Sequence, residues 1–428
     1  MDFNNSKKTL LASAVAFGLL STSSAVFAAG FQLAEYSATG LGRAYAGEAA
    51  MADNASAQWR NPAMMTYLSG TQISVGAIYV DPNIDVNGQI NGALNTQSDD
   101  FANSAVIPNF YVSHQLNEQL VLGVAFGTNY GMETEMNKDF AANHFGNEAM
   151  VKSMEANLNV GYQLNEALSV GGGIRYVMGE GHFGATSPAQ SEPTLPQGTT
   201  LKYMEGDDTA WGWQVGTAWQ INDDHRVGFA YKSEVELKLE GYAEGIGFGI
   251  PSATRDNGYM NLALPATAEI ASFHQLNEQL AIHASVNWTD WSSFEKLEAH
   301  LETYGTHMVK VENWEDNYRF AIGATYQLNQ KTALRTGVAY DTSAVNDKNR
   351  TITIPETDRT WLSIGASHDI SEQLTLDAGF TYILAKDANI SESRGYASDD
   401  AAQAVGGAFT GTTSGSVWLL GVQANYTF

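Results

Sequence analysis

Apolar and polar residues alternate with a period of two along much of the chain. In residues 318–328, for example, Tyr, Phe, Ile, Ala, Tyr and Leu occupy every second position, and the same pattern recurs in 280–289, 374–382 and 417–428. Successive side chains of a β-strand point to opposite faces, so this alternation predicts strands with one apolar face. A soluble β-sandwich would show the same alternation, with its apolar face turned toward a core.

A short motif closes six of these stretches. Each copy has an aromatic residue or His, a polar residue, an aliphatic residue and then turn-forming residues, at 114–118, 162–166, 219–223, 274–278, 326–330 and 368–372. Six tight reversals join twelve strands, and one strand before the first copy and one after the last make fourteen. The repeat therefore predicts a fourteen-stranded antiparallel β-barrel.

Three features favour a membrane barrel over a sandwich. The strands have about ten residues, aromatic residues lie at strand ends, and the short turns fall on one side only. The opposite connections are long and fall near 81–103, 133–152, 180–205, 242–261, 301–314, 342–356 and 386–415. The pattern predicts a barrel in the outer membrane of a Gram-negative bacterium, with both termini and the short turns in the periplasm.

The two ends of the chain carry targeting signals. Lys7 and Lys8, an apolar run at 9–20 and small residues at 21–28 predict a signal peptide, residues 1–28, that is removed on export. The chain ends in Tyr-Thr-Phe, which resembles the recognition signal of outer-membrane barrels and predicts that the barrel-assembly machinery binds the terminal Phe428. An ordinary terminal strand is the alternative for that last segment.

Composition narrows the functions that remain. A net charge of −25 and a sequence pI near 4.6 make nucleic acid an unsuitable partner. Acidic loops suit a surface where divalent cations bridge lipid phosphates, so outer-membrane lipid and lipopolysaccharide are the expected neighbours of a monomer. The sequence has no Gly-x-Ser-x-Gly motif and no His cluster with metal-ligand spacing. We therefore expect no enzymatic activity, no cofactor and no metal site.

Residues 29–69 do not alternate. They are rich in small residues, and a fourteen-stranded barrel leaves a lumen that side chains alone cannot fill. A disordered periplasmic tail is the alternative, but Phe31, Leu33, Tyr36 and Trp59 make the segment too apolar for that. We expect residues 29–69 to form a partly helical plug and residues 70–428 to form the barrel.

This segment contains the motifs Gly30-Phe-Gln-Leu33, Gly40-Leu-Gly-Arg-Ala-Tyr45 and Arg60-Asn-Pro-Ala63. They resemble the plug of the FadL family, outer-membrane transporters of long-chain fatty acids. Further matches follow in order, among them residues 128–131, 205–208 and 288–291, so that the resemblance covers essentially the whole mature chain. The plug residues that it singles out are Phe31, Leu33, Gly40, Asn61, Pro62 and Ala63.

The resemblance implies a route for a hydrophobic molecule. Extracellular loops capture the substrate, a pocket inside the barrel binds it, and a kink in the third strand releases it sideways into the membrane. The kink maps to Asn129, Tyr130 and Gly131, where a glycine allows a bulge that interrupts the hydrogen bonding of the wall. The alternative is that Gly127 and Gly131 only allow close packing.

The resemblance leaves the binding residues open. The loop with Ile246, Phe248 and Ile250 is expected to expose apolar groups for capture, although such residues often pack on neighbouring loops. A fatty-acid carboxylate needs a cation, and the candidates are Arg175, Arg319 and Arg335, which share the inward-facing parity, with His182 at the mouth of a strand. Structural ion pairs are the alternative, because Glu155 and Asp377 share that parity.

One departure from the family bears on the substrate. Glu180 and Glu315 stand where some fatty-acid transporters of this kind have basic residues. A channel for neutral or aromatic hydrocarbons is therefore the alternative to a fatty-acid transporter. A general porin or an adhesin barrel is a further alternative, and the apolar plug argues against an open pore.

Overall fold

The barrel closes through its first and last strands. In this computed structural model, which describes residues 30–193 and 195–428, β1 (Thr71–Ile90) pairs with β21 (Phe409–Thr427) from Gln72↔Thr427 to Ile90↔Phe409. Every strand in between pairs with its neighbours along the chain, and the result is the expected fourteen-stranded antiparallel barrel. The expected signal peptide, residues 1–28, lies outside the described residues.

Five of the fourteen strands are interrupted and carry two labels each. The uninterrupted strands between β1 and β21 are β3 (Ala105–Gln115), β6 (Glu148–Gln163), β7 (Leu168–Thr186), β8 (Thr200–Asn222), β17 (Thr332–Asp341), β18 (Arg359–Asp369) and β19 (Leu374–Ala385). The interrupted strands are β4 and β5 (Leu120–Gly127, Gly131–Glu135), β9 and β10 (His225–Lys232, Val235–Glu244), β11 and β12 (Asp256–Leu264, Thr267–Gln275), β13 and β14 (Leu280–Thr289, Lys296–Leu301), and β15 and β16 (Gly305–Val311, Asn317–Asn329). The short strands β2 (Leu94–Ser98) and β20 (Ala388–Ser391) extend the sheet at the loop end.

The repeated motif forms the short hairpin turns, and its Asn explains why it recurs. The Asn117 side-chain oxygen accepts hydrogen bonds from the amides of Gln119 and Leu120 at 2.9 and 3.0 Å. Asn165 and Asn277 make the same pair of bonds in their own copies. An Asn side chain that satisfies the turn amides favours a tight reversal.

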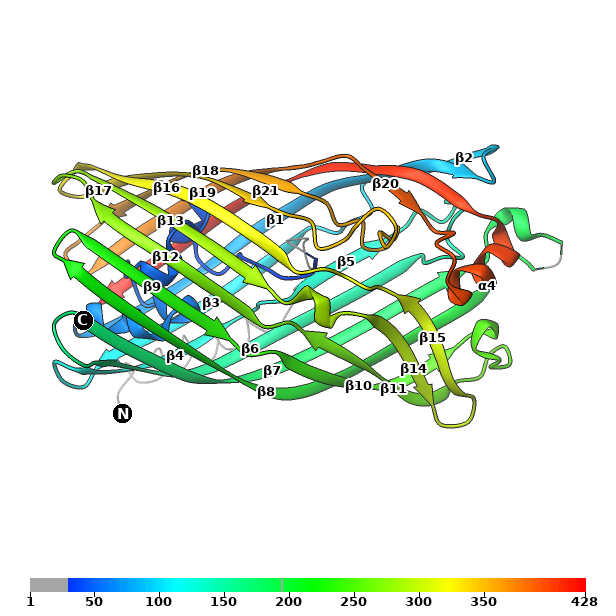
Figure 1. The fold of residues 1–428 in the computed structure, drawn as a ribbon, viewed down its shortest axis with the longest axis horizontal. Helices are drawn as coiled ribbons and strands as arrows, with labels where there is room; N and C mark the ends of the chain where they lie inside the picture. The colour runs from blue at the N-terminus through cyan, green and yellow to red at the C-terminus, as the bar shows by residue number, and fades with distance from the viewer. Residues whose placement is uncertain (1–29, 194) are drawn as a thin grey trace, which may run out of the picture.

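The two ends of the barrel differ as expected, with two corrections. Figure 1 shows the C terminus at the end with the short turns, and β2, β20 and α4 (Ala397–Gly406) at the other end. However, 301–314 is not a long loop but largely a hairpin of β14 and β15, and β1 continues to Ile90 through the expected loop 81–103. Both stretches pair as strands beyond the apolar band of the outer surface, because their apolar residues face inward: Ile84, Val86 and Ile90 are buried in β1, and Leu297, Ala299 and Leu301 are buried in β14.

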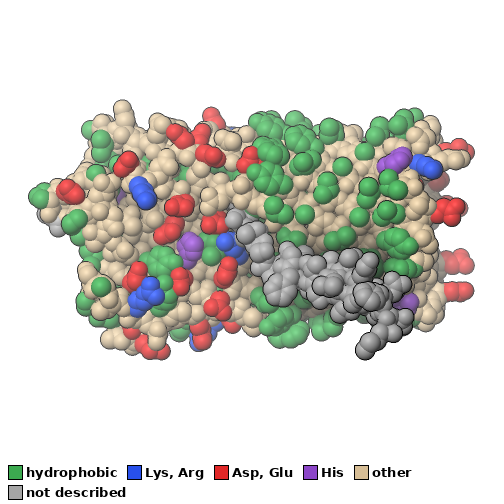
Figure 2. All heavy atoms as spheres, turned by 180° about the vertical axis from the view of Figure 1, so that it is seen from behind, with side chains coloured by type: hydrophobic (Ala, Val, Ile, Leu, Met, Phe, Trp, Pro, Cys, Tyr) green, Lys and Arg blue, Asp and Glu red, His purple; other side chains and the backbone are tan. Residues whose placement is uncertain are grey.

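The outer surface carries the band that a membrane barrel requires. On the face in Figure 2, hydrophobic side chains gather over the half with the short hairpins, and charged side chains over the half with the loops. Acidic residues mark the tips of the hairpins. No helix among the described residues is long and apolar enough to span a bilayer.

Residues 30–69 fill the lumen in the half near the short turns (Figure 1). They form α2 (Ala38–Leu41), η1 (Glu48–Ala50), α3 (Ala57–Arg60) and η2 (Pro62–Tyr67), joined by buried turns. Inward-facing glycines of the wall let the plug backbone approach. A Cβ atom at Gly161 would lie 2.8 Å from the Pro62 carbonyl oxygen, and one at Gly171 would lie closer than 3.0 Å to the amide of Ala63. Glycine at such positions is a steric requirement of the plug.

Candidate functional site

The third barrel strand is interrupted at the residues that the resemblance singles out. β4 ends at Gly127 and β5 begins at Gly131. The ladder between β3 and β4 stops at Phe110↔Phe126, and the wall closes again only at the bridge Ala102↔Thr134. The wall therefore has a gap between residues 105–109 and the segment around 128–131, roughly 20 Å along the strand at about 3.4 Å per residue.

The start of the plug lies in this gap. The Leu33 amide donates to the Asn129 carbonyl oxygen at 2.6 Å, and the Gly131 amide donates to the Phe31 carbonyl oxygen at 2.8 Å. Gln32 and Tyr130 form the bridge between these two bonds. Residues 31–33 thus act as a short strand against the interrupted strand.

Phe31 is the centre of an aromatic cluster formed by segments where other strands are interrupted. Its ring lies 4.6 Å from Trp291, 5.5 Å from Phe294, and 6.1 Å from both Trp314 and Tyr130. Phe31 also lines a chamber of about 30 Å³. The other apolar residues that line it include Met132, Met150, Phe183, Leu239, Met260, Leu262, Phe294 and Ile354. The chamber is almost filled by its own side chains, since a single water needs about 10–15 Å³.

A larger cavity of about 250 Å³ lies on the loop side of this chamber. Phe183 lines both cavities, so they are adjacent. The wall of the larger cavity is mostly apolar and includes Phe145, Ile246, Val309, Ala402 and Val405, the last two from α4.

Two amines line the larger cavity. The Lys310 ammonium donates to the Phe145 carbonyl oxygen at 3.0 Å and lies 3.3 Å from the Glu392 carboxylate. The Lys202 ammonium donates to the Met308 carbonyl oxygen at 3.3 Å. Within the described residues, no carboxylate lies within 4.0 Å of Lys202. Lys202 is therefore the cation of this cavity that is available to an anionic ligand.

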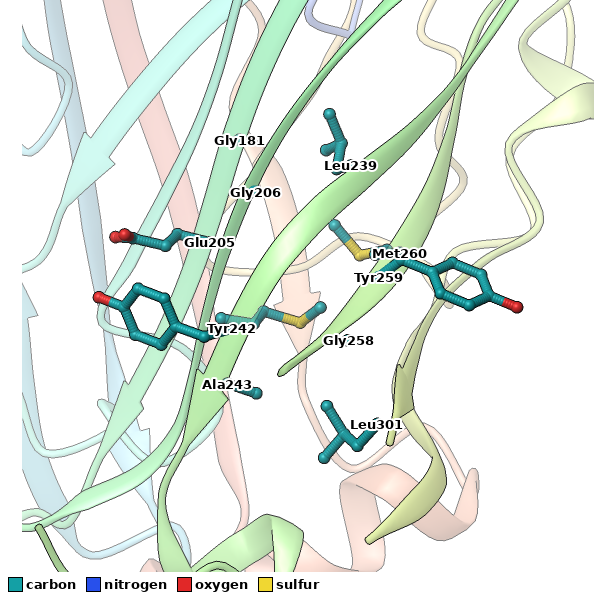
Figure 3. A pocket seen from close by; sticks show the side chains of 11 residues that line it. Gly181, Glu205, Gly206, Leu239, Tyr242, Ala243, Gly258, Tyr259, Met260 and Leu301 are labelled. Carbon is teal, nitrogen blue, oxygen red and sulfur yellow. The ribbon is translucent and has the colours of Figure 1, made fainter. Parts of the chain in front are cut away.

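A row of inward-facing glycines thins the wall beside the chamber. Gly181 pairs with Gly206, Gly206 with Gly241, and Gly241 with Gly258, on four adjacent strands. Three of them line a hollow that shares Gly181, Leu239 and Met260 with the chamber. Figure 3 shows Leu239, Met260 and Leu301 around it, with Tyr242 and Tyr259 pointing away in opposite directions. The row of glycines allows the sheet to bend, because neighbouring backbones can come close where no side chain lies between them.

The three candidate arginines all face the lumen, and each lies close to a carboxylate. Arg175 pairs with Glu155 at 2.8 Å, and Arg319 pairs with Asp341 at 2.8 Å. Arg335 lies 3.7 Å from Asp53 and 3.6 Å from Asp377. This arrangement matches the alternative of structural ion pairs across the lumen.

The other charged residues of interest have their side chains on outward-facing rows or in loops. His182 belongs to the outward-facing row of β7, 3.9 Å from Glu148 and stacked on Tyr203 at 6.0 Å, although it also borders the chamber between Gly181 and Phe183. The structure thus separates His182 from the three arginines. Glu180 is exposed on the same row, and Glu315 is exposed and accepts a hydrogen bond from Asn346 at 2.7 Å. Neither Glu lines the two cavities, so neither carboxylate would contact a ligand bound there.

The expectation that Ile246, Phe248 and Ile250 are all exposed is wrong. Ile246 is 41% exposed and lines the larger cavity, but Phe248 and Ile250 are each only 1% exposed. Phe248 packs on His307 at 5.5 Å and beneath the Lys202 ammonium at 5.7 Å. Loop side chains of this size are buried by neighbouring strands, as the alternative proposed.

The Asn-Pro-Ala motif anchors the plug. The Asn61 amide nitrogen donates to the Ala49 and Thr217 carbonyl oxygens at 2.6 and 3.0 Å, and its oxygen accepts from the Ala63 amide at 3.0 Å. Pro62 occupies the first turn of η2, where its missing N–H costs nothing. A Cβ atom at Gly40 would lie 2.7 Å from the Tyr45 ring.

Sequence reasoning missed the two lysines and most of the aromatic cluster. Lys202 and Lys310 lie in stretches interpreted as loops, Trp291 and Phe294 lie between the expected strand 280–289 and the expected loop 301–314, and Trp314 ends that loop. One signal was present in the composition. The chain has 22 Lys and Arg residues and 47 Asp and Glu residues, so a cation without a carboxylate partner stands out as a candidate for binding an anionic ligand. Among the described residues, no group of three or more His, Asp and Glu side chains is placed to hold a metal ion.

Comparison with known proteins gives a consistent result. Residues 19–428 match the family described as outer membrane protein transport protein (OMPP1/FadL/TodX). The chain is 33% identical to the long-chain fatty acid transport protein of Escherichia coli O6:H1, over 99% of this chain and 100% of that protein. It is 32% identical to outer membrane protein P1 of Haemophilus influenzae, over 97% of this chain and 99% of that protein.

Solved structures share the fold. A Pseudomonas aeruginosa FadL homologue superposes with a TM-score of 0.83 at 20% identity, covering 94% of this chain and all of that one. The Pseudomonas putida toluene transporter TodX gives a TM-score of 0.69 at 15% identity, covering 92% of this chain and 99% of that one.

Proposed function

Because the chain belongs to the OMPP1/FadL/TodX family of outer-membrane transport proteins, which carry hydrophobic molecules and are not enzymes, we propose that it takes up long-chain fatty acids. It is an outer-membrane β-barrel protein of Gram-negative bacteria. The long-chain fatty acid transport proteins at 33% identity over full length support this choice of substrate.

One observation carries the proposal: an apolar chamber lies beside a gap in the wall, while a plug fills the lumen below it. Phe31 belongs to both features, because its ring lines the chamber and its carbonyl oxygen bonds the Gly131 amide in the gap. A water-filled pore would suit a polar solute, but an alkyl chain gains about 0.8 kcal/mol for each methylene that it buries. The arrangement thus fits lateral release of an apolar molecule at Asn129, Tyr130 and Gly131.

The charges suggest how the substrate lies. Lys202 and Lys310 would hold the carboxylate in the larger cavity, where Ile246 and α4 line the entrance. The alkyl chain would point past Phe183 toward Phe31. The opposite orientation is unfavourable, because the chamber contains the buried carboxylate of Glu312, whose partner is the Trp314 indole N–H at 3.0 Å.

The chamber must enlarge before an alkyl chain can enter. Its free volume of about 30 Å³ holds two or three waters at most. Displacement of Phe31 is the simplest way to enlarge it, and Phe31 is attached to the segment that fills the gap. Binding of the substrate would therefore loosen residues 31–33 and open the route to the membrane.

Locking the gap tests this route. Gln32 and Tyr130 are bridge partners, so cysteines at these positions have the separation that a disulfide needs, and the chain has no cysteine of its own. In a host that lacks its own transporter, we expect the oxidised Q32C/Y130C variant to take up labelled oleate at under a tenth of its reduced rate. Uptake that is equal in the oxidised and reduced states would exclude release through this gap.

The substrate class needs a separate measurement. Mass spectrometry of lipids that co-purify with the native barrel should find free fatty acids. Recovery of neutral aromatic molecules alone would favour the hydrocarbon channel instead.

A further inference from the structure

Three breaks in the wall face one another across the lumen. Besides the third strand at 128–130, the seventh strand is interrupted between Lys232 and Val235, and the eighth between Leu264 and Thr267. The ladder between β8 and the seventh strand stops at Gln214↔Lys232 and resumes at Asp207↔Glu240. Residues 208–212 are thus in a ladder with β7 alone, while the Trp213 carbonyl oxygen still accepts from the Ser233 amide at 2.9 Å.

Asn129 joins the first break to the second. Its side-chain nitrogen donates to the Glu155 carboxylate at 2.6 Å, and its oxygen accepts from the Lys232 ammonium at 3.1 Å. All three side chains are buried. Both polar atoms of this amide are therefore held by charged groups, and hydrogen bonds to charged groups are about twice as strong as neutral ones.

Arg175, on β7, connects Glu155 to the break in the seventh strand of the barrel. Its Nε and Nη2 atoms donate to the two oxygens of Glu155, each at 2.8 Å, and its Nη1 atom donates to the Ser233 carbonyl oxygen at 2.8 Å. The bidentate geometry fixes the guanidinium in one orientation. Ser233 lies inside the break, so the Glu155–Arg175 pair bonds the third-strand break at one end and the seventh-strand break at the other.

Tyr130 joins the first break to the third. Its hydroxyl donates to the Pro265 carbonyl oxygen at 2.6 Å, inside the break of the eighth strand. Two adjacent residues of the third strand therefore bond two different strands on the far side of the lumen.

We propose that Glu155, Arg175 and Lys232 are positioning residues that hold Asn129 in the gap, and that the side chains of Asn129 and Tyr130 transmit the closed state of the gap to residues 233–234 and 265–266. Arg175 and Tyr130 each donate to a main-chain carbonyl inside a break, at Ser233 and Pro265. These bonds restrain the backbone where the regular ladder is interrupted. The coupling between the breaks does not depend on the proposed function. Only the statement that the coupling serves lateral release rests on it.

Hydrogen exchange of the full-length protein in nanodiscs tests the coupling without any substrate. We expect Asn129→Ala to speed exchange at 233–236 at least threefold, and Tyr130→Phe to do so at 266–268. Arg175→Met should speed exchange at both 128–131 and 233–236. Exchange that rises only at 128–131 in Asn129→Ala would overturn the proposal.

Thr128→Val is the matched control. Thr128 lies in the same break and bonds the Tyr130 carbonyl oxygen at 3.2 Å and Ser153 at 3.2 Å, but it contacts none of the positioning residues. It should speed exchange at 128–131 and leave 233–236 unchanged. If Thr128→Val also loosened 233–236, the coupling would not depend on Asn129 and the proposal would fail.

Oleate uptake separates this proposal from the function. Coupled exchange in a protein that does not take up oleate would leave the coupling intact and refute the proposed function. Independent exchange in a protein that does take up oleate would refute the coupling alone. Far-UV circular dichroism of each variant shows that the barrel is folded.

Discussion

The amide of Leu33 donates a 2.6 Å hydrogen bond to the carbonyl oxygen of Asn129, so a residue of the plug takes the place of a partner strand in the wall. A strand edge without a partner carries unsatisfied main-chain groups, which are costly in a membrane. Residues 31–33 satisfy part of this edge from inside. The gap is therefore closed by a segment that can leave without breaking the barrel ladder.

Phe31→Ala should release this segment. The Phe31 side chain is fully buried, and Phe→Ala substitutions in cores cost about 3–5 kcal/mol. We expect hydrogen exchange of the Leu33 and Gly131 amides to accelerate at least tenfold. Phe140→Ala is the matched control, because Phe140 is equally buried but packs on Phe409 at 5.5 Å in the loop end. Equal acceleration in both variants would show that Phe31 has no special part in closing the gap.

Lys202→Met should weaken fatty-acid binding but not binding of the methyl ester. A hydrogen bond to a charged group contributes about 1.5–3 kcal/mol, so the Kd for oleate should rise roughly tenfold or more. Fluorescence competition with both ligands measures this difference. Lys386→Met, which removes an exposed ammonium paired with Asp358 at 3.2 Å, should change neither Kd. A parallel loss of ester and acid binding would instead mean that Lys202 supports the shape of the cavity.

The barrel could be predicted from the sequence because its rules are local. Asn117, Asn165 and Asn277 each bond the amides two and three residues ahead, Ser371 makes the same pair of bonds in the last copy, and Asn222 and Asn329 bond the amide two residues ahead. Each copy of the motif therefore favours a reversal by itself. Alternation then fixes the face of every side chain, and Arg175, Arg319 and Arg335 do face the lumen. The turn motif and the alternation can each be recognised within a single strand and its turn.

The site could not be predicted in the same way, because it is formed by contacts across the lumen. Parity places Arg175 inside but does not show that Glu155 already pairs with it. Nothing in the sequence around Lys202 indicates that it lacks such a partner. The strand break at 233–234 also has no strong local signal, whereas the break at 265–266 has one in Pro265, which cannot donate a main-chain hydrogen bond to the ladder. The loop end was misjudged because β14 and β15 pair as a hairpin whose apolar residues, among them Leu301 and Val309, face inward while its outer face is polar.

Gly171→Ala should loosen the plug, whereas its neighbour Gly172→Ala should not. A Cβ atom at Gly171 would clash with the main chain of Pro62 and Ala63, while one at Gly172 would have no heavy atom nearer than 3.4 Å. Overpacking of this kind costs about 1–3 kcal/mol, and a substitution without such a clash costs within about 0.5 kcal/mol. Thermal unfolding in detergent should show a lower Tm for Gly171→Ala alone. Equal Tm values would mean that the plug backbone shifts freely.

Acid should loosen the loop end through His144. Its Nε2 atom lies 2.8 Å from the Gly407 carbonyl oxygen, next to the end of α4. Burial lowers the pKa of His144 from 6.5 to about 4, and the hydrogen bond to Gly407 only partly opposes this effect. The closed loop therefore holds neutral His144, whereas an open loop exposes an imidazole with the ordinary pKa. The contribution of His144 to the closed state is complete above pH 6.5 and is lost progressively toward pH 4, by up to about 3 kcal/mol.

Hydrogen exchange of residues 403–408, corrected for its intrinsic pH dependence, measures this loss. We expect protection to fall between pH 6.5 and 4 in the native protein and to stay level in His144→Gln, which keeps a side-chain N–H for the Gly407 carbonyl but does not titrate. Because Ala402 and Val405 of α4 line the cavity with Lys202, binding of the methyl ester of oleate, which does not titrate, should weaken over the same pH range in the native protein only. A fall in protection of the same size in His144→Gln would assign the acid effect to another group.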